Sequence, residues 1–192
     1  NYILQTVDDV EKDQYDVIVL FNSSHGFNYL NSTSKHTFFV AHPTASGSIS
    51  QEEFQTYGIS LELEIFKTLK KKGAPTVLVF SESCNVPINI EVPAMYKTMN
   101  PNIGNRLKEL FLSEPAHIIS SSSEYGQYSY TDNKEGGIYV NSLLHAMNDV
   151  TTKCDKASWD KVWVVQHFVV VMRVTNVDHN QCHQWEARQE FS

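Results

Sequence analysis

The sequence has few charged residues, few cysteines and no long hydrophobic run. Charged side chains make up 19% of the 192 residues, and 22 acidic against 15 basic residues leave a net charge of −7. A negative chain repels nucleic acid, and the one basic run, Lys70 to Lys72, follows a helical pattern whose carboxyl end favours cations. No apolar run approaches the roughly 18 residues of a transmembrane helix. We therefore expect neither nucleic acid nor a membrane as a partner.

Three cysteines are too few, and odd in number, for a disulfide framework. A reduced compartment suits a reactive thiol better, so we expect a cytoplasmic protein. The apolar share of 41% is enough for a sizeable core and argues against a disordered chain. At this length the chain fits a single domain, residues 1–192.

Short apolar runs, each followed by polar residues, predict three buried and mainly parallel strands. They are residues 15–21, 76–80 and 117–120, and a shorter strand is predicted at 37–40. A capping box at 50–53 predicts the start of a helical turn that ends at Gly58. An apolar stripe at Leu61, Ile65 and Leu69 predicts a helix that stops at Gly73. Further helices are predicted over 105–112, 138–147 and 159–174. This alternation predicts an α/β fold with a mainly parallel sheet.

The polar ends of the three strands carry the candidate chemistry. They contain His25-Gly26, Glu82-Ser-Cys84 and Ser122-Ser-Glu124. Because parallel strands end at one edge of their sheet, and ligand sites lie beyond that edge, these residues are expected to converge. An imidazole can take the proton of a thiol and so activate it as a nucleophile. The backbone N–H groups of Gly26 and Cys84 would form an oxyanion hole.

Two of these motifs resemble the catalytic motifs of caspases and metacaspases. Residues 17–26 resemble the first motif, and residues 78–85 resemble the second, in the order noted for caspases and about 50 to 60 residues apart. The acid two residues before Cys84 is closer to metacaspases than to animal caspases. Residues 119–124 and 137–144 look like the third strand and the helix that follows it.

The resemblance implies a three-layer α/β sandwich with a mainly parallel central sheet flanked by helices, and a cysteine endopeptidase that acts on proteins or peptides. His25 would act on Cys84 as base and then as acid, and no cofactor or metal is implied. Glu82 would bind an Arg or Lys side chain at P1, with Ser122 and Glu124 lining the same pocket. The three arginines of the chain are not beside these motifs, so an Asp-specific pocket is not expected. Loops 86–104 and 123–136 are candidate sites of zymogen processing.

Some features depart from the family pattern and favour other hypotheses. Asn85-Val86-Pro87 follows the cysteine, where the family usually has a glycine. The family's first strand and helix have no clear counterpart, so either they have been removed or another segment of the same protein completes the fold. A second hypothesis is therefore a degraded caspase-like domain that acts as a scaffold or regulatory module, and a third is an ordinary α/β binding domain. The group Cys154, His179, Cys182 and His183 fits no standard zinc spacing, so no metal site is expected.

Overall fold

The computed structural model describes residues 2–29, 32–41, 52, 56–85, 106–129, 131–132 and 136–166. The chain divides into two compact units. The first holds Asn1–Thr98 and Pro115–Ile138, and the second holds Met99–Glu114 and Tyr139–Ser192. All of the strand ends that carry the candidate chemistry belong to the first unit.

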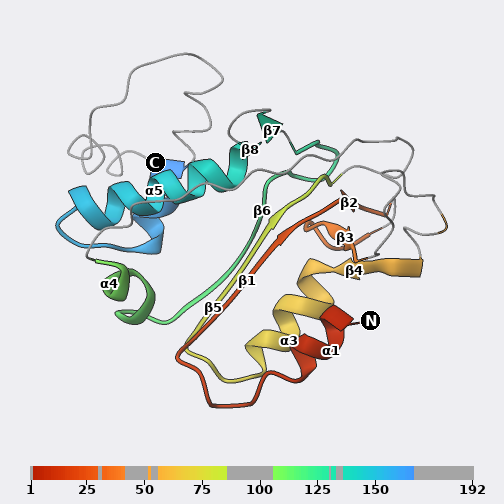
Figure 1. Ribbon diagram of the computed structural model, residues 1–192, viewed down its shortest axis with the longest axis horizontal. Coiled ribbons are helices and arrows are strands. Elements are labelled where there is room, and N and C mark those ends of the chain that lie inside the picture. Colours follow the sequence, from red (N-terminus) through yellow and green to blue (C-terminus); the bar gives the residue numbers. More distant parts are fainter. Residues whose placement is uncertain are drawn as a thin grey trace. The chain divides into compact units, whose positions relative to one another are not determined.

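A three-stranded parallel sheet forms part of the first unit, and its long strands run side by side (Figure 1). The strand order is β1 (Val17–Ser23), β5 (Thr76–Glu82) and β6 (Ala116–Ser121). In the register, Ser23 lies opposite Glu82 and Ser81 lies opposite Ser121, so the three strands end at the same level. The parallel sheet together with its helices confirms the predicted α/β fold.

The three strands differ in burial. All seven residues of β5 are buried, as predicted. The prediction of a buried strand is wrong for β1, where the Val19 and Phe21 side chains are 52% and 47% exposed. The exposed residues alternate along the strand, so one face of β1 is uncovered. Among the described residues β1 is also an edge strand, since it pairs only with β5. The prediction of a buried strand is also wrong for β6, where His117 is exposed and the other residues are half-buried.

Helices α1 (Tyr2–Asp8) and α3 (Lys67–Lys70) lie beside each other (Figure 1), and α3 continues a π-helical segment, η1 (Leu61–Phe66). The predicted stripe of Leu61, Ile65 and Leu69 is confirmed, because these side chains pack in one core cluster with valines of β5.

Of the capping box predicted at 50–53, only residue 52 is described. The N-cap seen in the structure is Ser60, whose hydroxyl accepts the Leu63 N–H at 3.0 Å. The predicted stop at Gly73 is confirmed by its φ of 85°.

A second, antiparallel sheet is formed by β2 (Gly26–Phe27), β3 (Phe38–Val40) and β4 (Gly58–Ser60). The strand predicted at 37–40 is therefore present, but it belongs to this sheet and not to the parallel one. A two-stranded ladder joins β7 (Thr131–Asp132) to β8 (Gly136–Gly137). Loop 86–104, predicted as a processing site, lies outside the described residues.

The second unit contains α4 (Leu107–Leu112), most of α5 (Ile138–Lys153) and helical residues 159–166. All three helices were predicted, although α5 extends further than expected. The predicted cap of the last helix is confirmed by the Ser158 hydroxyl, which accepts the Lys161 N–H at 3.5 Å. Cys154 is disulfide-bonded, a bond that was not predicted from the three cysteines. None of the helices that the structure describes has the length and hydrophobicity needed to cross a bilayer.

Candidate active site

His25 and Cys84 occupy equivalent positions at the ends of neighbouring strands. The last residue of β1, Ser23, lies opposite the last residue of β5, Glu82, and each candidate follows its strand end by two residues. The Ser24 N–H donates to the Glu82 carbonyl at 3.3 Å, which continues the ladder past the strand end. The structure thus brings together the two chain segments that the sequence singled out.

Gly26 is the point of closest approach between the two segments. A methyl group at Gly26 would overlap the Cys84 carbonyl oxygen and lie 2.6 Å from the Ser83 Cβ, so a side chain does not fit here. The Val40 N–H donates to the His25 carbonyl at 3.0 Å. In an antiparallel ladder this bond makes Gly26 and Phe39 a non-hydrogen-bonded pair, so the Gly26 N–H points away from β3.

Cys84 is a free, half-buried cysteine whose sulfur and backbone are both held by neighbours. The Ser129 N–H donates to Sγ at 3.4 Å, and the Thr37 hydroxyl donates to the Cys84 carbonyl at 2.7 Å. Sequence reasoning missed both partners. Ser129 lies five residues beyond the polar motif at 122–124, and Thr37 is the residue before β3, so neither carried a motif that could have identified it.

Ser122 lies beside the nucleophile segment. Its hydroxyl accepts the Ser83 N–H at 3.0 Å and lies 2.8 Å from the Ser129 hydroxyl. Ser122 therefore connects Ser83, the residue before Cys84, to Ser129, whose N–H donates to the Cys84 sulfur. Glu124 differs: its side chain is exposed, and its backbone forms a turn with Gln127, whose N–H donates to the Glu124 carbonyl at 2.9 Å.

Glu82 is buried, with 6% of its surface exposed, at the end of the fully buried strand β5. Its carboxylate faces the backbone of Gly137, because a methyl group added at Gly137 would overlap the carboxylate atoms. The carboxylate therefore occupies a closely packed position against Gly137.

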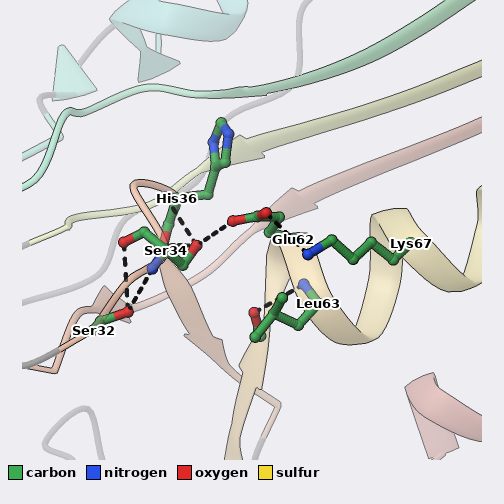
Figure 2. A network of polar contacts seen from close by, with 7 residues as sticks. Ser32, Ser34, His36, Glu62, Leu63 and Lys67 are labelled. Carbon is green, nitrogen blue, oxygen red and sulfur yellow. Dashed lines mark hydrogen bonds and ion pairs between the residues drawn. The ribbon is translucent and has the colours of Figure 1, made fainter.

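A polar network links η1 to the loop over residues 32–37 (Figure 2). The Ser34 hydroxyl donates to the Glu62 carboxylate at 2.7 Å, and the Lys67 ammonium lies 3.3 Å from the same carboxylate. The Ser34 hydrogen bond, with help from Lys67, lowers the pKa of Glu62. Burial lowers the pKa of His36, an effect that the nearby Glu62 charge opposes. This network fixes the loop that carries Thr37.

No group of three or more His, Cys, Asp and Glu side chains that could hold a metal ion occurs within the described part of the chain. Of the four possible zinc ligands considered from the sequence, Cys154 is disulfide-bonded. The other three, His179, Cys182 and His183, lie outside the described residues.

Comparison with known proteins identifies a family. A family model described as a caspase domain matches residues 1–169, a range that includes both motifs and all three strands of the parallel sheet. No curated protein and no solved structure matches the chain.

Proposed function

This chain belongs to the caspase-domain family, a family of cysteine peptidases, and on that premise we propose that it cleaves peptide bonds with Cys84 as nucleophile and His25 as base. The observation that carries the proposal is the β1–β5 register, which sets both residues two positions beyond paired strand ends. Loops at the carboxyl ends of parallel strands are where such sheets bind ligands.

The proposed reaction is acyl transfer in two steps. His25 takes the Cys84 thiol proton, and the thiolate attacks the carbonyl carbon of the scissile bond. The Gly26 and Cys84 N–H groups stabilise the oxyanion, and His25 then gives its proton to the leaving amine. Water, deprotonated by His25, hydrolyses the thioester and releases the acid product. The Ser129 N–H at Sγ supports this role, because a donor at the sulfur stabilises its negative charge.

We further propose that Glu82 selects Arg or Lys at P1. In metacaspases the acidic residue two positions before the catalytic cysteine has this role, and Glu82 stands two positions before Cys84. The buried carboxylate at the end of β5 supports this, since a guanidinium or ammonium group of the substrate would interact with it strongly at low solvent exposure. Ser122 and Glu124 follow β6 and would contribute from the neighbouring strand end. The packing of Gly137 against the Glu82 carboxylate then sets how closely a basic side chain can approach.

The exposed strand β1 supports the proposal that another segment of the same protein packs against the parallel sheet. Tyr15, Val19 and Phe21 expose large apolar side chains on or beside β1. We propose that another segment of the same protein covers this edge, because exposed apolar strands at a sheet edge favour pairing. Segment 123–136 remains a candidate processing site.

Short fluorogenic peptides ending in Arg, Lys or Asp test the proposal. Wild type should release the fluorophore after Arg and Lys, and Cys84→Ala should release none. A matched control is the substitution Ser83→Ala at the residue before Cys84. In this variant the Cys84 thiol should still react with an alkylating reagent. Cleavage that persists in Cys84→Ala would exclude the mechanism, and cleavage after Asp alone would retain the nucleophile but remove the role of Glu82.

A degraded domain acting as a scaffold is the alternative, and the described site does not favour it. His25, Gly26 and Cys84 are all present at the paired strand ends, and Cys84 is a free thiol. A scaffold would show no cleavage and no preferential alkylation of Cys84.

A further inference from the structure

Two buried amide side chains join the segment after His25 to the segment after Cys84. The Asn28 Nδ2 donates to the Asn85 Oδ1 at 2.8 Å, and both residues are 0% exposed. Asn28 follows His25 by three residues, and Asn85 follows Cys84 directly. A buried amide–amide hydrogen bond therefore joins the segments that follow the two proposed catalytic residues.

The remaining polar atoms of Asn85 are bonded to two other segments, the loop over residues 32–37 and residues 123–127. Its Nδ2 donates to the Lys35 carbonyl at 2.9 Å and to the Ser123 carbonyl at 3.5 Å. Its backbone N–H donates to the Gln127 carbonyl at 3.0 Å, and its carbonyl accepts the Gly126 N–H at 2.8 Å. A buried polar group that is fully bonded in this way has one favourable orientation, because any other orientation leaves atoms unsatisfied.

Asn28 is bonded in the same manner. Its Oδ1 accepts the Tyr29 N–H at 2.8 Å, and its Nδ2 also lies 3.4 Å from the carbonyls of Ser34 and His36. These two carbonyls belong to the loop over residues 32–37, which the Ser34–Glu62 network of Figure 2 holds against η1. The amide pair thus rests on a loop that is itself fixed.

We propose that Asn28 and Asn85 are positioning residues that hold the Cys84 thiol and the His25 imidazole in register. The inference rests on the proposed peptidase function and deepens it. Neither amide needs to touch the substrate. Their effect is geometric, because a shift of about 1 Å in a catalytic group can lower a rate by about 100-fold. The function also accounts for an asparagine at position 85, since a glycine there would leave the Asn28 amide and the Lys35 and Ser123 carbonyls without this partner.

A double-mutant cycle tests the proposal. Asn28→Ala and Asn85→Ala should each lower kcat about 10- to 100-fold while KM changes less than about threefold. Because both substitutions break the same link, the double variant should be no more than about threefold slower than the slower single variant. Asn141→Ala removes a buried amide of α5 and serves as the control: it should lower stability but leave kcat of the folded protein within about threefold.

The pH dependence of Cys84 alkylation by iodoacetamide supplies a readout that does not require peptide cleavage. A protein that cleaves no peptide would contradict the proposed function, but slower alkylation of Cys84 in both variants would still support the positioning role. If Asn85→Ala does not fold, Asn28→Ser and Asn85→Ser are compared instead. Any of three results would overturn the proposal. The first is a loss of kcat in the double variant that equals the product of the two single losses. The others are a change confined to KM and an unaltered pH dependence of Cys84 alkylation.

Discussion

Replacing Gly26 by alanine should damage the site through one added methyl group. That carbon would overlap the Cys84 carbonyl oxygen and lie 2.6 Å from the Ser83 Cβ and 2.7 Å from the Thr37 Oγ1. Two of these atoms are firmly held, since the Cys84 carbonyl belongs to the backbone and accepts the Thr37 hydroxyl at 2.7 Å. Overpacking of a closely packed site costs about 1–3 kcal/mol, and we expect the upper end here.

The same methyl group should also lower activity, because the least costly relief is to move the Cys84 backbone away from Gly26. A displacement of about 1 Å at the nucleophile corresponds to a loss of about 100-fold in kcat. Urea unfolding measures the change in free energy, and peptide cleavage and Cys84 alkylation measure the effect on the site. Cleavage is compared at equal concentrations of folded protein.

Gly73→Ala is the matched control for this prediction. A methyl group at Gly73 would overlap the Asp13 side chain, and the φ of 85° adds strain of about 1–2 kcal/mol, so the loss of stability should be similar. Gly73 precedes β5, whereas Cys84 follows it, so the two sites are separated by the length of the strand, about 20 Å. The folded Gly73→Ala variant should therefore keep its activity. Equal activity losses in the two variants, or a Gly26→Ala protein that is as stable and active as wild type, would refute the reasoning.

Three further predictions concern other charged and polar groups. His25→Ala should lower kcat/KM by about 10²- to 10⁴-fold and slow alkylation of the thiol at neutral pH, as steady-state kinetics and mass spectrometry would show. Gly137→Ala should displace the Glu82 carboxylate and reduce the preference for Arg over Asp peptides; an unchanged preference would argue against a pocket at Glu82. The Ser34 hydrogen bond lowers the pKa of Glu62, so its stabilisation is present above the unfolded pKa of about 4.3 and is lost as pH falls through the folded value. Glu62→Gln should therefore reduce the loss of urea stability between pH 6 and pH 3.

The strand ends could be predicted from sequence because a buried strand followed by a polar turn is a local pattern. The run at 76–80 and its polar end at 81–85 gave β5 and Cys84 in this way. The exposure of Val19 and Phe21 could not be predicted, because a strand at an edge and a strand at the centre have the same apolar composition. Sheet position depends on pairing partners that are distant in the sequence.

The supporting contacts of the site were not predictable for a related reason. Thr37 and Ser129 reach Cys84 through one hydroxyl and one backbone N–H, and neither kind of group leaves a sequence signature. Ser122 was expected at the pocket and does lie beside Ser83 and Ser129. Its hydrogen bonds in the structure are to the protein, so its proposed contact with substrate would have to be made in addition to them.

The residues after Cys84 were the strongest sequence argument for a degraded site, and the structure gives Asn85 a different meaning. A glycine in such a loop permits close backbone approach. Here the close approach to Cys84 is made from the opposite side, by Gly26, while the Asn85 side chain fills a buried position and bonds to Asn28 and Lys35. A side chain that is fully buried and bonded on several sides stabilises the loop that carries the nucleophile. Departure from the family pattern after Cys84 is therefore compatible with an ordered thiol.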